Sequence, residues 1–265
     1  MLFRCQEAQL KTDLKYTNQH DDPDWGARYS EVGSDADLKN IFICHVNVSD
    51  IEKISQELAK MVMDHSWIMN LEPVAKLAYE PAVRETALAL EKTFKNKLTT
   101  ENKIAKEFGE IMVSMGASRA LEALFEHTAI PIAELWKPKK KQNEGFDFHT
   151  VCLEKLINFG EAKFSGSSNP YGGKSGSSSG AGGQADGFIS ANKHQRDGVH
   201  LLHLAGKEPT DNLNNLHFGI VLAFSLNSLT PLSILESAIG TAKEYLHLKK
   251  AKKIYLVGVS HALED

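Results

Sequence analysis

The pattern of apolar and polar positions divides the chain into a polar N-terminal stretch, a helical section and a section with sheet character. Residues 1–40 are polar and rich in turn-forming residues, so we expect them to run over the surface. An apolar, β-branched run at residues 41–48 predicts a strand. Apolar residues at three- and four-residue spacing predict helices over residues 50–67, 81–98 and 100–125. Their expected first residues are Ser49 or Asp50 as a cap, Pro81, and Thr100 as a cap.

After Pro131 the periodicity changes to that of a sheet. Two extended stretches, Gly145–His149 and Val151–Phe164, follow each other closely enough to form a hairpin. Buried strands are predicted at residues 200–204, 217–226 and 253–259, and helices at residues 184–195 and 233–250. Because a helix separates the last two strands, we expect a right-handed parallel crossover between them.

Together these elements predict an α/β fold with a mixed β-sheet flanked by helices, preceded by a helical N-terminal section. We divide the chain into residues 1–99, expected to dock a partner, and residues 100–265, expected to form the core. Seven of the 19 glycines and six serines lie between Gly166 and Gly183. Residues 165–183 are therefore expected to form a flexible loop, with contact to a nucleic acid as the alternative.

Composition limits the class of protein. The chain has 265 residues, of which 42% are hydrophobic, which is enough for a core and excludes wholesale disorder. No apolar run approaches the roughly 20 residues of a membrane span, and the first residues lack a signal-peptide core. We therefore expect a cytoplasmic protein without membrane contact. Three scattered cysteines argue against a disulfide framework and against a cysteine-ligated zinc site.

The formal net charge of −4 is unevenly distributed. Residues 1–40 carry five basic and eight acidic side chains, which is −3 of the total, so the remainder is nearly neutral. Basic residues flank the predicted hairpin in sequence, and contact with nucleic-acid phosphates competes there with the simpler interpretation of a solvated face. The candidates for such contacts are Lys139, Lys140, Lys193 and Arg196.

The predicted hairpin brings together the residue types of a metal-dependent hydrolase. Glu161 and Lys163 alternate on one strand and so point to the same face, and Asp147 joins them if the two stretches pair. Two carboxylates suit Mg²⁺ or Mn²⁺, while the ammonium could orient water or neutralise charge on a phosphate. A surface ion-pair cluster is the alternative. Nearby His149 is expected to be structural rather than to contact phosphate.

In this order, Asp147 and Glu161-Ala162-Lys163 resemble the PD-(D/E)xK nuclease signature, although Phe146 occupies the place of the proline. Phe108-Gly109-Glu110 resembles the Gly-Glu that such nucleases carry on their first core helix. The resemblance covers about residues 100–260, and it implies a restriction-endonuclease-like core. More narrowly, these segments resemble the nuclease subunit of Hachiman-type antiphage systems. That family implies DNA degradation in partnership with a superfamily 2 helicase.

The resemblance implies that Asp147, Glu161 and Lys163 are catalytic, and that Asp147, Glu161 and Glu110 bind Mg²⁺ or Mn²⁺. Periodicity points to a different helical acid. At about 100° per residue, Glu107 lies about 85° from the centre of the apolar stripe and Glu110 about 145°. Periodicity therefore favours Glu107 as the acid closer to the sheet, whereas the motif favours Glu110. An alternative function is a regulatory or DNA-holding scaffold subunit with a vestigial site.

Overall fold

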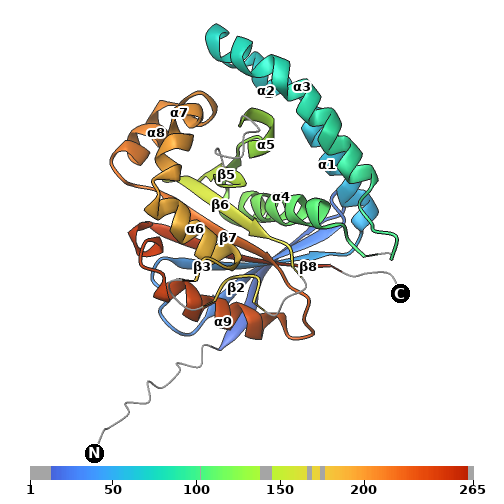
Figure 1. Ribbon diagram of the computed structural model, residues 1–265. Coiled ribbons are helices and arrows are strands. Elements are labelled where there is room, and N and C mark those ends of the chain that lie inside the picture. The colour runs from blue at the N-terminus through green and yellow to red at the C-terminus, as the bar shows by residue number, and fades with distance from the viewer. Residues whose placement is uncertain (1–12, 102, 138–144, 166–168, 174–176, 262–265) are drawn as a thin grey trace, which may run out of the picture.

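The computed structural model describes residues 13–101, 103–137, 145–165, 169–173 and 177–261, which form an α/β fold around an eight-stranded sheet (Figure 1). In their order across the sheet, the strands are β1 (Leu14–Asp22), β2 (Ala27–Ser34), β3 (Ile41–Val48), β8 (Lys253–His261), β7 (Gly219–Ser225), β6 (Ile157–Lys163), β5 (Phe148–Val151) and β4 (Thr128–Ala129). The helices are α1 (Ile51–Met63), α2 (Ser66–Met69), α3 (Pro73–Lys95), α4 (Lys106–Phe125), α5 (Ala133–Trp136), α6 (Gly180–Ser190), α7 (Lys193–Ala205), α8 (Lys207–Asn214), α9 (Pro231–Glu244) and the 3-10 turn Leu248–Lys250.

The sheet is mixed, as expected. Its four central strands, β3, β8, β7 and β6, run parallel, and antiparallel strands extend it on both sides. The expected parallel pairing of β7 and β8 across the intervening helix α9 is confirmed. The predicted hairpin is also confirmed, because β5 pairs antiparallel with β6. The sheet draws strands from both sections of the chain, β1 to β3 from residues 1–99 and β4 to β8 from residues 100–265.

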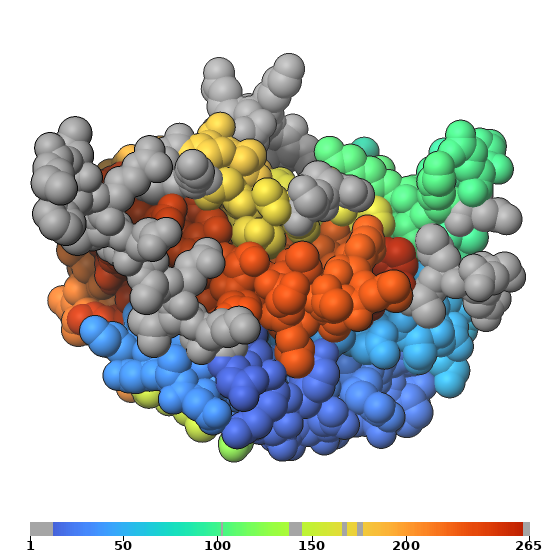
Figure 2. Space-filling view, turned by 90° about the horizontal axis from the view of Figure 1, so that it is seen from below, coloured from blue at the N-terminus to red at the C-terminus, as the bar shows by residue number. Residues whose placement is uncertain are grey.

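Helices cover both faces of the central strands. Helix α4 contacts most of the sheet on one face, and α1 and α3 pack outside it. On β8, Val259 faces Gly116 of α4, whereas the neighbouring Gly258 lies against Leu235 of α9. Helix α9 therefore covers the opposite face. Figure 2 views the molecule from below, with the N-terminal strands in blue beside the C-terminal segments in orange. None of the helices in the described part of the chain is long and apolar enough to cross a membrane.

Within the described residues 13–40, the chain forms two strands, β1 and β2. The expectation that it runs over the surface is confirmed for β1, which is almost entirely exposed, and wrong for β2. Trp25, Tyr29 and Val32 are buried and anchor β2. The sequence concealed these strands because β1 is an edge strand with almost every residue exposed, so it lacks the alternation that indicates a half-buried strand.

The three helices predicted before Pro131 have different bounds in the structure. Asp50 caps α1 by accepting a hydrogen bond from the Lys53 amide, as expected, but the helix ends at Met63. Pro81 does not begin a helix, because α3 starts eight residues earlier and carries Pro81 in its interior. Thr100 lies in a turn before α4, whose first residue is Lys106.

The strand predicted at residues 200–204 is wrong, because these residues belong to α7. Leu201 is buried while its neighbour Leu202 is 46% exposed, so the short apolar run is one side of an amphipathic helix. The helix predicted at residues 184–195 is divided between α6 and α7 by Asn192, whose φ of 55° is left-handed.

The C-terminal end of the expected loop at residues 165–183 belongs to a helix. Helix α6 begins at Gly180, and Tyr171 is buried against Phe224. A Cβ at Gly183 would lie 2.2 Å from the Ser177 carbonyl oxygen, so the glycine permits a close approach of two backbone segments. Residues 166–168 and 174–176 lie outside the described residues.

Candidate active site

The β5–β6 hairpin fixes the position of Asp147. This residue immediately precedes β5, and its amide donates a hydrogen bond to the Gly160 carbonyl of β6. Its side chain turns back to the same strand, where Oδ2 accepts a hydrogen bond from the Ala162 amide at 2.8 Å. Both the backbone and the carboxylate of Asp147 are therefore held against β6.

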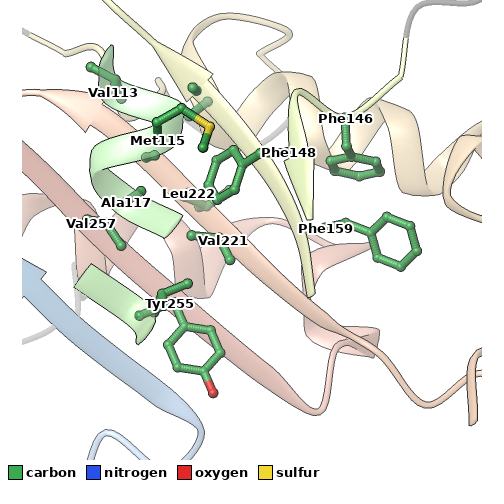
Figure 3. Packing of buried hydrophobic residues seen from close by; sticks show 14 of the residues in the cluster. Val113, Met115, Ala117, Phe146, Phe148, Phe159, Val221, Leu222, Tyr255 and Val257 are labelled. Atoms are coloured by element: carbon green, nitrogen blue, oxygen red, sulfur yellow. The ribbon is translucent and has the colours of Figure 1, made fainter. Parts of the chain in front are cut away.

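Aromatic packing holds the hairpin between two layers of helices. Figure 3 shows Phe148 beside Met115 of α4, whereas Phe146 and Phe159 lie together on the other side of the hairpin. Phe146 and Phe159 have ring centroids 5.2 Å apart. A Cβ at Gly160 would lie 2.4 Å from the Phe148 ring, so glycine is required opposite this large side chain.

Glu161 and Lys163 alternate on β6, as the sequence predicts. The Lys163 ammonium lies 3.3 Å from Oε1 of Glu161, and the Glu161 side chain is completely buried. Despite this ion-pair contact, neither carboxylate oxygen of Glu161 has a partner with good hydrogen-bond geometry among the described residues. A buried carboxylate in that state is unfavourable unless a cation or a proton compensates it.

The pKa values express this lack of compensation. Burial raises the pKa of Asp147 to about 6, against the opposing effects of the Ala162 amide and the Lys163 charge. Burial and the neighbouring Asp147 charge raise the pKa of Glu161 well above its ordinary value. Burial alone would lower the pKa of Lys163, but the surrounding carboxylates raise it on balance, so this lysine stays charged.

Glu110 is the helical acid that lies close to the site. Its charge raises the pKa of both Asp147 and Lys163, and its side chain is 36% exposed. Glu107 is exposed, whereas Glu110 is half-buried, so the interpretation from periodicity is wrong. The reason is that α4 is buried on most sides, which makes a single apolar stripe a poor guide to the side that faces the sheet.

A second group of charged residues, which we call the tether cluster, lies beside the hairpin and consists of Lys137, His149 and Asp197. The Lys137 ammonium lies 2.8 Å from Oδ2 of Asp197, and Nε2 of His149 lies 3.3 Å from the same oxygen. His149 is fully buried, so its predicted structural role is confirmed. Lys137 and Asp197 were missed because they are 60 residues apart in sequence and belong to no local motif.

The candidate nucleic-acid contacts differ in their surroundings. Lys139 and Lys140 lie outside the described residues. The Lys193 ammonium lies 4.0 Å from the centroid of the Phe188 ring, which partly engages its charge. Arg196 is exposed on α7, one residue before Asp197 of the tether cluster.

The two buried acids fit a hard divalent cation. Among the described residues, neither carboxylate oxygen of Glu161 has a partner with good hydrogen-bond geometry, and Asp147 adds a second carboxylate beside it. Among the described residues, no group of three or more His, Cys, Asp and Glu side chains is arranged to hold a metal ion. A bound Mg²⁺ would therefore need further oxygen ligands from the backbone and from water, which this ion commonly retains.

Comparison with known protein families, curated proteins and solved structures gives no match.

Proposed function

We propose that this protein is a Mg²⁺- or Mn²⁺-dependent deoxyribonuclease with a restriction-endonuclease-like core. The observation that carries the proposal is the completely buried Glu161 carboxylate, which lies beside Asp147. The Lys163 ammonium lies 3.3 Å from Oε1 of this carboxylate, and neither of its oxygens has a partner with good hydrogen-bond geometry among the described residues. A purely structural ion pair gains stability by satisfying its buried groups. The deficit at Glu161 instead favours a site that is completed by a cation.

The side chains of Asp147 and Glu161 would hold the metal together with the backbone carbonyl of Ala162, and Glu110 would bind at the more exposed side. Bound Mg²⁺ would polarise the scissile phosphate and lower the pKa of water. Lys163 remains charged because the carboxylates around it raise its pKa. Its ammonium would orient the attacking water and neutralise charge that develops on the phosphate.

We propose DNA as the substrate, and a cytoplasmic antiphage complex with a superfamily 2 helicase as the setting. Both come from the resemblance to Hachiman-type nuclease subunits, which is carried by Asp147, Glu161-Ala162-Lys163 and Phe108-Gly109-Glu110. Arg196 is an exposed candidate for phosphate contact near the hairpin. Phosphate contacts carry no sequence information, so cleavage is expected without strong sequence specificity. The nearly neutral charge outside residues 1–40 fits an enzyme that binds DNA weakly alone and depends on its partner.

The test is a cleavage assay with the purified protein, alone and with its helicase. We expect degradation of DNA with Mg²⁺ or Mn²⁺ and none with EDTA. Lys163→Ala is expected to lower the rate by about 10²–10³-fold, because one preorganised electrostatic group is lost. The matched control is Lys253→Ala. Lys253 also forms an ion pair and lies on a strand of the same sheet, but it is on β8 rather than on the hairpin. Full activity in Lys163→Ala with retained folding would overturn the assignment.

Calorimetric titration with Mn²⁺ tests the metal site without depending on cleavage. The wild-type protein is expected to bind the ion, and Asp147→Ala is expected to abolish binding. DNA binding without cleavage under any divalent metal would instead support the scaffold with a vestigial site.

A further inference from the structure

Lys137 makes three interactions, one of which is with the backbone directly before Asp147. Its ammonium donates a hydrogen bond to the Phe146 carbonyl at 2.6 Å and lies 2.8 Å from Asp197. The same ammonium lies 5.2 Å from the centroid of the Trp136 ring. With 12% of its side chain exposed, Lys137 is too enclosed to serve as a general surface charge. A buried cation held this tightly fixes the position of the groups it contacts.

The chain leaves room for this contact at Gly145. A Cβ at this position would lie 2.9 Å from Nζ of Lys137 and 3.1 Å from Oδ1 of Asp197. The absence of a side chain therefore lets the ammonium reach the backbone beside Phe146. The next residue is Asp147, whose carboxylate depends on its backbone position to reach the Ala162 amide.

We infer that Lys137 is a positioning residue for Asp147, and that Asp197 on α7 holds Lys137 in place. This inference rests on the proposed function in treating Asp147 as a metal ligand. Groups that orient metal ligands commonly change metal affinity or activity by about 10–100-fold when they are removed. Because the Lys137 ammonium hydrogen-bonds to the Phe146 carbonyl, its loss would remove the link between α7 and the backbone that carries Asp147.

The charge of Lys137 and its hydrogen bond to the Phe146 carbonyl, which we call the tether, act on metal affinity in opposite directions. One measurement of affinity therefore separates them. Lys137 also acts through its charge, which lowers the pKa of both Asp147 and Glu161. Removing a cation near two acids should by itself tighten the binding of a divalent metal. Loss of the tether should weaken that binding. The direction of the change in Lys137→Met therefore separates positioning from simple electrostatics.

The first measurement is Mn²⁺ affinity by calorimetry. We expect Lys137→Met to bind Mn²⁺ about 10-fold more weakly than the wild type. The matched control is Lys253→Met, because Lys253 is also ion-paired, at 2.6 Å from Glu154, and lies 5.4 Å from the centroid of an aromatic ring, Phe42. The control should keep wild-type affinity. Equal or tighter Mn²⁺ binding in Lys137→Met overturns the inference.

A steady-state assay on DNA adds a readout that a contact with substrate would not reproduce. We expect Lys137→Met to lower kcat while KM for DNA is unchanged, because the ammonium is enclosed by protein. A raised KM with unchanged kcat would assign Lys137 to DNA binding and overturn the positioning role. If Lys137→Met does not fold because Asp197 is left unpaired, the double variant Lys137→Met/Asp197→Leu removes both charges. It should show the same weakened Mn²⁺ binding, and wild-type affinity there would overturn the inference.

Amide hydrogen exchange of the metal-free protein keeps this inference separable from the proposed function. We expect faster exchange at the amides of Asp147 and Ala162 in Lys137→Met and no change in Lys253→Met, since both amides hydrogen-bond across the hairpin. If the wild type neither binds Mn²⁺ nor cleaves DNA, the nuclease assignment fails. The hydrogen-exchange rates still show whether Lys137 holds the backbone at Asp147 in place. If the wild type does both and exchange is unchanged in Lys137→Met, only the tether is overturned.

Discussion

Two groups of buried charge lie at the same hairpin and are built in opposite ways. In the tether cluster of Lys137, His149 and Asp197, the Asp197 carboxylate is compensated, although Nδ1 of His149 has no hydrogen-bond partner among the described residues. Burial alone would raise the pKa of Asp197, but hydrogen bonds and charge from His149 and Lys137 lower it on balance. The acidic cluster of Asp147, Glu161 and Lys163 is only partly compensated. Burial raises the pKa of both acids despite the nearby lysines, and repulsion adds to it, from Glu110 at Asp147 and from Asp147 at Glu161.

The difference between the clusters separates scaffold from site. A satisfied buried network stabilises one arrangement of the chain, whereas an unsatisfied acid destabilises the fold and is usually associated with function. The tether cluster joins α5, β5 and α7, so it holds the surroundings of the acidic cluster in place. Substitutions in the two clusters should therefore change stability in opposite directions.

The largest expected effect is a loss of stability in Asp197→Ala. This change leaves the Lys137 ammonium buried without its carboxylate, which typically costs about 3–5 kcal/mol in the free energy of unfolding. Urea unfolding monitored by circular dichroism measures it. As a control, Glu154→Ala removes the exposed partner of Lys253 and should cost about 1 kcal/mol or less. Equal losses in the two variants would contradict the compensated character of the tether cluster.

The next effect is a pH dependence that arises from Asp147. Its pKa is about 6 in the folded protein, compared with an ordinary value of 3.8. The folded state therefore binds the proton more tightly, and this contribution to stability is lost as the pH rises from about 4 through 6. In EDTA, the stability of the wild type relative to Asp147→Asn should fall by about 2–3 kcal/mol between pH 4 and pH 8.

Unfolding curves of both proteins at the two pH values measure this difference. Added Mg²⁺ should restore the stability of the wild type at pH 8 and leave Asp147→Asn unchanged. A difference that is independent of pH would show that Asp147 is already compensated in the metal-free protein.

A smaller effect of opposite sign is expected for Glu161→Gln. The substitution replaces a buried carboxyl group whose oxygens have no partner with good hydrogen-bond geometry among the described residues, so the metal-free protein should gain about 1 kcal/mol at pH 8. The same variant should lose Mg²⁺ binding and cleavage. Thermal unfolding in EDTA, paired with a Mn²⁺ titration, measures both. Destabilisation together with normal metal binding would assign Glu161 to the scaffold.

The contrast between the clusters also explains how far the sequence could predict the site. Asp147, Glu161 and Lys163 could be placed together because they lie on adjacent strands of a local hairpin, where a period of two fixes the faces. Lys137 and Asp197 could not be paired from the sequence, because only the packing of α7 against the hairpin brings them together. Local periodicity carries no information on contacts of that range.

The same limit applies to the fold. The buried central strands at residues 41–48, 217–226 and 253–259 were predictable because continuous apolar runs mark strands covered on both faces. The edge strand β1 was not, since it is exposed and polar. Periodicity favoured Glu107 over the Glu110 of the motif for a related reason, because it assumes that a helix has a single buried face, whereas α4 is buried on most sides.

The smallest expected effect concerns DNA contact at α7. Arg196 is exposed, whereas the Lys193 ammonium lies over the Phe188 ring. We therefore expect Arg196→Ala to raise KM for DNA a few-fold and to reduce the slope of log affinity against log salt by about 1, as for the loss of one phosphate contact. Lys193→Ala should have the weaker effect on both quantities.

Measuring KM over a series of salt concentrations tests this difference, with kcat unchanged in both variants as the internal control. Arg196 directly precedes Asp197, so a phosphate bound there would be held by the same helix that holds Lys137 and, through it, Asp147. DNA position and ligand position would then share one rigid support. An unchanged salt slope in Arg196→Ala would restrict α7 to the scaffold and leave DNA contact to other basic residues.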